Sequence, residues 1–270
     1  MRTLPFILSL ITTLLLTSVL GQDDPTLKKT FVLIDKKENY PKALDILNDF
    51  ISKDTTSSNA YWQRAKCLRR LGKYDKAEDD LKRAIRLDSD NAKAFCELGS
   101  VYALTDRYDK SLESYNQSLN IDPNFATTYS NRGALYYYFL DDYDKAMDDY
   151  NQAIRLDPGN SYPYYNRGVI YHLRGEVKYA INDFTKSLQI KPKDHQTHFQ
   201  RGICYYKEGE YKKAIKDFKK AMKYNDQLDP FEALNKGEIY YWRSLCFEKT
   251  GRTKKAQKDR KKAKVLGYNI

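Results

Sequence analysis

The sequence has few residues that interrupt helices, with only 8 Pro and 12 Gly among 270 residues. Proline removes a backbone donor and clashes inside a helix, so its scarcity favours long helical segments. Beyond residues 4–20, no stretch is apolar enough to span a membrane. Aromatic residues are plentiful, with 24 Tyr and 11 Phe, whereas disordered chains are poor in them. The sequence therefore predicts a packed, largely helical protein.

Residues that support catalysis or metal binding are sparse. The chain has three His, of which His195 and His198 are spaced so that both could reach one metal from the start of a helix. No third ligand accompanies them. No glycine-rich phosphate loop, nucleophile elbow or catalytic carboxylate motif occurs. We predict no enzyme activity, and we expect no catalytic residue, metal site or cofactor.

The four cysteines are widely spaced and form no CxxC motif. They are Cys67, Cys96, Cys204 and Cys246. Outside the cytosol, four cysteines could form disulfides in three connectivities. The alternative, which the wide spacing favours, is four small thiols on half-buried helix faces.

The N-terminus has the pattern of a secretory signal peptide over residues 1–21. Arg2 supplies the positive charge, residues 4–20 are uncharged and apolar, and a polar chain begins at Gln22. An uncleaved signal anchor is the alternative. We expect an exported protein, periplasmic or secreted, with a eukaryotic secretory lumen as the other possibility.

Small and bulky residues recur at a spacing of 34 residues, which becomes 35 once, between Gly133 and Gly168. The last step is 42 residues, because residues 225–236 form a longer connection. The first small column is Ala65, Gly99, Gly133, Gly168, Gly202 and Ser244. Two further small columns are Ala43, Ala77, Ser111, Ala146, Ala180, Ala214 and Ala256, and Ala84, Ser118, Ala153, Ser187, Ala221 and Ala263. A bulky column between these two is Leu81, Tyr115, Tyr150, Phe184 and Phe218. Small residues two turns apart lie on one helix face and let a neighbouring helix approach closely.

These columns, with Pro123, Pro158 and Pro192 closing successive repeats, resemble the tetratricopeptide repeat family. The resemblance implies an all-α fold, an α-solenoid in which helix-turn-helix hairpins form a right-handed superhelix. We expect five repeats over 58–228, namely 58–91, 92–125, 126–160, 161–194 and 195–228. Residues 22–57 form an atypical capping hairpin, because Phe31 replaces the expected small residue. Residues 229–270 form a connection and a basic C-terminal capping hairpin.

In this family, partner peptides usually lie along a concave face lined by the first helix of each repeat. Two residues before the first small column lies a largely amide column: Gln63, Glu97, Asn131, Asn166, Gln200 and Trp242. Amides both donate and accept hydrogen bonds, so they can pair with any peptide backbone. Solvated polar residues on a helix face are the alternative interpretation. The candidate groove residues are Trp62, Gln63, Asn131, Tyr137, Tyr165, Asn166, Phe199, Gln200, Tyr206 and Tyr241. The aromatic members would anchor a partner, or some would belong to the core.

An arginine column precedes the first small column: Arg64, Arg132, Arg167, Arg201 and Arg243, interrupted by Leu98. These guanidinium groups would either bind anions in the groove or pair with carboxylates such as Asp79 and Asp80 of the adjacent helix. We favour the pairing.

The net charge of +11 is concentrated near the C-terminus, where residues 252–264 carry eight basic residues against Asp259. A polar outer cap of a solenoid explains this charge, and contact with an anionic surface is the alternative. We predict a scaffold that binds an extended segment of a partner protein. The other hypothesis is a peripheral protein anchored to lipid headgroups or polysaccharide through 252–264. Nucleic acid is not an expected partner.

Overall fold

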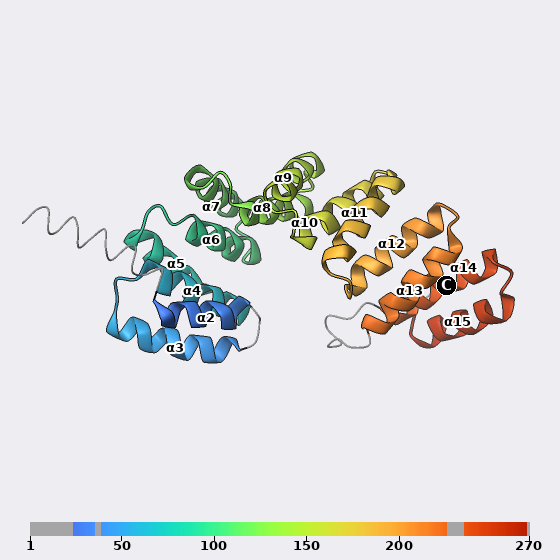
Figure 1. The fold of residues 1–270 in the computed structure, drawn as a ribbon, viewed down its shortest axis with the longest axis horizontal. Helices are drawn as coiled ribbons and strands as arrows, with labels where there is room; N and C mark the ends of the chain where they lie inside the picture. Colours follow the sequence, from blue (N-terminus) through green and yellow to red (C-terminus); the bar gives the residue numbers. More distant parts are fainter. Residues whose placement is uncertain (1–23, 36–38, 226–234, 269–270) are drawn as a thin grey trace, which may run out of the picture. The chain divides into compact units, whose positions relative to one another are not determined.

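A computed structural model of the chain describes residues 24–35, 39–225 and 235–268, and within them every regular element is a helix. The helices form two compact units, 1–135 and 136–270 (Figure 1). The expected signal peptide 1–21 lies outside the described residues, as does most of the connection after Asn225. No helix of the described residues is both long and apolar enough to cross a membrane.

The first unit contains three consecutive helical hairpins and the beginning of a fourth. Its helices are α2 (Pro25–Asp35), α3 (Tyr40–Lys53), α4 (Ser58–Arg70), α5 (Tyr74–Leu87), α6 (Ala92–Leu104), α7 (Tyr108–Ile121) and the larger part of α8 (Ala126–Phe139). α2 and α4 each pack against the second helix of their own hairpin and against the first helix of the next, and α6 packs against α7. In Figure 1 these helices run from blue to green.

The second unit begins within α8 and continues the same alternation. Its helices are α9 (Tyr143–Leu156), α10 (Ser161–Leu173), α11 (Val177–Ile190), α12 (His195–Lys207), α13 (Tyr211–Asn225), α14 (Lys236–Lys249) and α15 (Thr253–Val265). Because each unit is a stack of hairpins without strands in the described residues, the predicted all-α solenoid of helical hairpins is confirmed.

First and second helices begin differently. Most first helices start after a side-chain cap, as when Ser57 accepts from the Ala60 amide and Asp194 accepts from the Thr197 amide. Several second helices start without one, directly after a tight turn. In the turn before α5, Gly72 has a φ of +72°, and the Lys73 amide donates to the Leu68 carbonyl. This left-handed residue ends one helix and lets the chain reverse at once.

The small column is what brings the two helices of a hairpin together. A Cβ on Gly202 would lie 2.7 Å from the Phe218 ring, and one on Gly99 would lie 2.7 Å from the Tyr115 ring. These rings therefore fill the space that the missing side chains leave. The first small column thus fixes the closest approach between first and second helices.

The first helix of the N-terminal hairpin differs in register from the later first helices. Phe31, which stands in the small column, is exposed, and its ring centroid lies 6.2 Å from that of Trp62. The buried face of α2 is instead formed by Leu27, Thr30 and Ile34, which are spaced for one side of a helix. The shift of one position lets a bulky residue occupy the column without separating the helices.

Candidate functional site

The predicted amide column is largely engaged inside the protein. The Thr30 hydroxyl donates to Gln63 Oε1 at 2.7 Å, and Gln63 is buried. Asn131 Nδ2 donates to the Ser100 hydroxyl at 3.3 Å. Each of these bonds joins a first helix to the first helix of the preceding hairpin.

The same column includes Asn166 and Glu97, and it joins helices there as well. The Tyr138 hydroxyl donates to Asn166 Oδ1 at 3.1 Å, and Asn166 is 0% exposed. Glu97 accepts from Arg69 at 2.7 Å. The expectation that Gln63 and Asn166 are available to a partner is therefore wrong, because their amides are buried within the stack. Gln200 remains half-buried and accessible.

Two of the predicted aromatic groove residues belong to the core. Phe199 is 3% exposed, with its ring centroid 5.9 Å from that of Phe218. Trp62 is 8% exposed and packs against Phe31. The expectation that both face a partner is therefore wrong, because both rings are buried. Phe199 packs in the same apolar cluster as Phe218 and Ile203.

The second unit holds a connected aromatic surface formed by Tyr206, Tyr211, Tyr241, Trp242 and Tyr268. The Trp242 ring centroid lies 5.6 Å from that of Tyr206 and 6.1 Å from that of Tyr241. Tyr211 packs on Tyr206 at 5.5 Å, and Tyr268 packs on Tyr241 at 5.2 Å. All five residues are only half-buried. Sequence reasoning selected Tyr206 and Tyr241 but omitted Trp242, although it stands in the amide column.

Tyr137 and Tyr165, the other predicted aromatic residues, are also half-buried in the second unit. Tyr165 packs on Phe184 with ring centroids 5.9 Å apart, and Tyr137 contacts the exposed Tyr138. Burial raises the pKa of the Tyr165 and Tyr206 hydroxyls, so both are neutral donors at physiological pH. Such rings combine a large apolar area with a polar tip.

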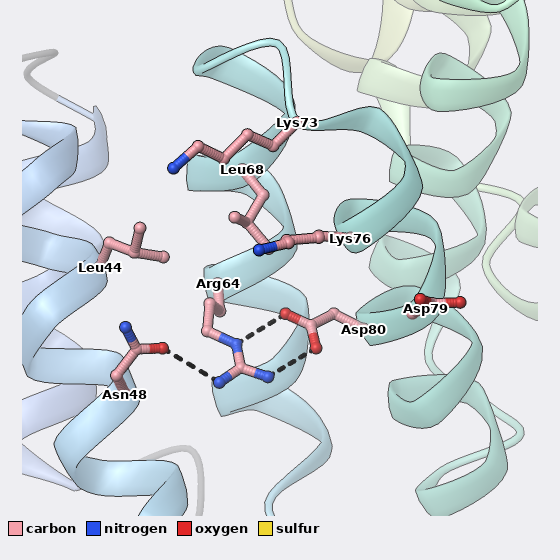
Figure 2. A pocket seen from close by; sticks show the side chains of 8 residues that line it. All are labelled: Leu44, Asn48, Arg64, Leu68, Lys73, Lys76, Asp79 and Asp80. Atoms are coloured by element: carbon pink, nitrogen blue, oxygen red, sulfur yellow. Dashed lines mark hydrogen bonds and ion pairs between the residues drawn. The ribbon is translucent and has the colours of Figure 1, made fainter.

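The arginine column is structural, and we name it the arginine ladder. In Figure 2, Arg64 of α4 lies between Asp80 of α5 and Asn48 of α3. Its guanidinium donates two hydrogen bonds of 2.7 Å to Asp80 and one of 3.1 Å to Asn48. The guanidinium therefore ties a hairpin together and joins it to the preceding one.

The ladder repeats in the second unit. Arg167 pairs with Asp183 at 2.7 and 2.8 Å, and it also donates to Asn151. Arg201 pairs with Asp217, and Arg243 pairs with Asp259, always sixteen residues apart. Where Leu98 interrupts the arginines, Ser114 stands in place of the aspartate. The guanidinium groups are thus used internally, and the pairing that the sequence favoured is confirmed for these three and for Arg64.

His198 and His172 contact side chains and backbone of neighbouring helices and do not converge on a shared metal position. His198 lies within 2.9 Å of an Asp217 oxygen and within 3.1 Å of the Pro192 carbonyl. His172 lies 2.9 Å from the Cys204 sulfur and 3.0 Å from Lys207 Nζ. Within the described residues, no group of three or more His, Cys, Asp or Glu is placed to hold a metal ion.

All four cysteines are free and buried. Burial raises the pKa of each thiol to about 12, so none is ionised at physiological pH. A thiol acts as a nucleophile only when ionised. These residues therefore serve as small apolar packing groups, and the disulfide alternative does not hold in this structure.

Comparison with known proteins agrees with the repeat architecture. The family descriptions "Tetratricopeptide repeat", over residues 56–124, 161–194 and 195–228, and "TPR repeat", over 137–175, match the chain. Together these matches cover more than half of its length. No curated protein sequence matches the chain.

Solved structures share the fold at low sequence identity. PilF of Pseudomonas aeruginosa has a TM-score of 0.69 at 20% identity, with 80% of this chain and 93% of that one covered. PilW, a type IV pilus biogenesis factor, has a TM-score of 0.64 at 20% identity, covering 78% and 94%. YrrB, which has an unusual peptide-binding site, has a TM-score of 0.50 at 18% identity, covering 66% and 91%. From its repeats, its hairpin stacks and these family matches, the chain belongs to the tetratricopeptide repeat family.

Proposed function

We propose that the chain is an exported scaffold that binds an extended segment of a partner protein on the first helices of its second unit. The observation that carries this proposal is the aromatic surface of Tyr206, Tyr211, Tyr241, Trp242 and Tyr268. Its rings contact one another yet stay half-buried. Because ring side chains lose little rotamer entropy on binding, they are favoured as interface anchors.

Gln200 adds a polar group on the same helix as Tyr206. It is the amide-column residue of that helix, α12. An amide can both donate to and accept from a peptide backbone. Aromatic rings can contact the apolar side chains of an extended protein segment, and the amide can form hydrogen bonds with its backbone. YrrB offers a precedent for peptide binding within this fold.

The export part of the proposal rests on residues 2–21, which have a basic start, an uncharged apolar run and a polar continuation. The solved structure of PilW belongs to a pilus biogenesis factor, which supports an assembly role for such a scaffold. N-terminal sequencing of the exported protein tests this part directly. A mature chain that begins at Gln22 supports it, and one that begins at Met1 contradicts it.

Affinity capture followed by mass spectrometry tests the binding surface. The bait is residues 22–270, compared with the double variant Tyr206→Ala/Tyr241→Ala. The matched control is Tyr129→Ala/Tyr164→Ala, because these tyrosines are equally half-buried but lie beneath Arg132 and Arg167. A partner retained by the control and lost by the first variant supports the proposal. Equal capture by both folded variants contradicts it.

A second candidate function is favoured by the end of α15. Val265 is 79% exposed and Leu266 is 46% exposed. They line a cleft of about 400 Å³ with Tyr240, Lys258, Lys261 and Lys262. Apolar residues beside lysines suit the surface of an anionic membrane. This alternative predicts that the protein binds anionic vesicles with an affinity that falls steeply as the salt concentration rises. The affinity of binding through the aromatic surface should change little over the same range.

A further inference from the structure

A cleft of about 430 Å³ lies between α3, α4 and α5 in the first unit. It is lined by Leu44 and Asn48 of α3, Arg64 and Leu68 of α4, and Lys73, Lys76, Asp79 and Asp80 at the start of α5. Figure 2 shows the Lys73 and Lys76 side chains reaching towards α3, whereas Asp79 points away from it. The cleft does not involve the aromatic surface of the second unit.

The later hairpins show what ordinarily fills this position. Where α4 has Leu68, the later first helices carry Tyr102, Tyr136, Tyr171, Tyr205 and Phe247. Second-helix residues cover these rings. Arg107 lies over Tyr102 at 4.5 Å, Lys145 lies over Tyr136 at 5.3 Å, and the Tyr179 ring packs on Tyr171 at 5.4 Å. Lys213 lies over Tyr205 at 5.6 Å, and Lys255 lies over Phe247 at 6.0 Å.

The hairpin of α4 and α5 lacks both this ring and the carboxylate that a preceding helix would supply. In the next hairpin, Arg107 and the Tyr102 hydroxyl both donate to Glu78, which the preceding helix α5 supplies, at 2.7 Å and 3.3 Å. The residue that corresponds to Glu78 is Leu44. The ammonium groups of Lys73 and Lys76 consequently have no ion pair, hydrogen bond or ring contact with any described residue.

The charges of the cleft favour an acidic occupant. Arg64 and Asp80 neutralise each other through two hydrogen bonds. The other charged residues of the cleft are the two lysines, Lys73 and Lys76, and one carboxylate, Asp79, so the positive charge is in excess. Leu44 and Leu68 give the cleft an apolar wall, and Leu68 is buried. A flat apolar group that also carries negative charge matches both features.

We propose that this cleft binds an aromatic side chain flanked by carboxylates, on an acidic segment of a partner protein. The incoming ring occupies the place that tyrosine fills in the later hairpins, and it lies beneath Lys73 and Lys76. The flanking carboxylates pair with the same two ammonium groups. The proposal deepens the protein-binding function and rests on it, but it concerns a separate surface.

The test uses the purified chain and the peptide Glu-Asp-Tyr-Asp-Glu, capped at both ends, titrated while backbone amide shifts are followed by NMR. We expect shifts confined to α3, α4 and the start of α5. The variant Leu68→Tyr supplies the missing ring from within, so it raises the melting temperature and weakens binding by about tenfold or more. A peptide with Ala in place of Tyr binds about tenfold more weakly to the wild-type chain.

A charge variant keeps the proposal testable if Leu68→Tyr fails to fold. The double substitution Lys73→Gln/Lys76→Gln is expected to weaken peptide binding about tenfold. The matched control Lys110→Gln removes the corresponding lysine of the next hairpin, where Tyr102 already fills the position, and leaves affinity unchanged. The double variant Tyr206→Ala/Tyr241→Ala also retains peptide binding, which separates this proposal from that for the aromatic surface. Wild-type-like affinity of folded Leu68→Tyr, or of the lysine double variant, would overturn it, as would the absence of peptide binding at millimolar concentration.

Discussion

At the scale of single residues, buried charge pairs join the hairpins. Arg167 is an example, because its guanidinium holds Asp183 with two hydrogen bonds and also reaches Asn151 of the preceding hairpin. Asp183 is almost completely buried. A carboxylate in that position is tolerated only while it is paired. The arginine ladder therefore makes each buried aspartate depend on one particular guanidinium.

We predict that Arg167→Met lowers the free energy of unfolding by about 3 kcal/mol, because it leaves Asp183 buried without its partner. The double variant Arg167→Met/Asp183→Leu should recover most of this loss. Arg155→Met, on an exposed arginine, is the control and should change stability by less than about 0.5 kcal/mol. Urea denaturation measures all three. A double variant no more stable than the single would contradict the dependence.

Glu78 gives a prediction about pH. Burial alone would raise its pKa, but hydrogen bonds from Arg107 and Lys82 lower the pKa from 4.5 to about 2. Because the folded pKa is below the unfolded one, ionised Glu78 stabilises the fold fully above about pH 4.5 and loses this effect as the pH falls towards 2. The melting temperature of Glu78→Gln should lie below that of the wild type at pH 7 and converge with it near pH 2. A constant difference across this range would exclude the assignment.

At the scale of helices, residue size is matched between the two members of a hairpin. Gly99, Gly168 and Gly202 face the rings of Tyr115, Phe184 and Phe218, with distances from a hypothetical Cβ of 2.7 to 2.9 Å. Ala65, by contrast, stands in the same column opposite Leu81. Glycine therefore occurs where the second helix contributes a ring, and alanine occurs where it contributes leucine.

This matching predicts the outcome of Gly202→Ala. The new methyl group meets Phe218, and overpacking of this kind costs about 1–3 kcal/mol, which outweighs alanine's helix preference of about 1 kcal/mol at the upper end. Adding Phe218→Leu recreates the Ala65–Leu81 combination and should restore part of the stability. Thermal unfolding of both variants checks this. A stabilised single variant would show that the ring moves aside at little cost.

The sequence predicts most of the helical pattern because the small and bulky columns keep one spacing along the chain. It predicts the candidate site less well. The position of Asn166 on the first helix follows from the repeat, but its burial depends on Tyr138, twenty-eight residues earlier, which occupies its oxygen. The burial of Phe199 likewise depends on the Phe218 ring of the adjacent helix, against which it packs. Such neighbours are set by the packing of separate helices, which a pattern along one helix does not contain.

At the scale of the whole molecule, the two tryptophans report on different units, since Trp62 lies in the first and Trp242 in the second. In repeat proteins, stability is close to a sum over units and their interfaces. We predict that Gly202→Ala lowers the urea midpoint measured by Trp242 fluorescence more than that measured by Trp62, using single-tryptophan variants with Phe at the other position. Equal shifts of both midpoints would show that the units unfold together.

The central claim is that the first helices of the second unit hold a partner protein. Site-specific photo-crosslinking tests it most directly, with benzoylphenylalanine placed at Tyr241 and, as the control, at the exposed Lys219 on a second helix of the same unit. Crosslinking is performed in the native compartment. We predict a discrete crosslinked protein from Tyr241 and none from Lys219. Equal crosslinking from both positions, or none from Tyr241 while the chain is folded, would contradict the account.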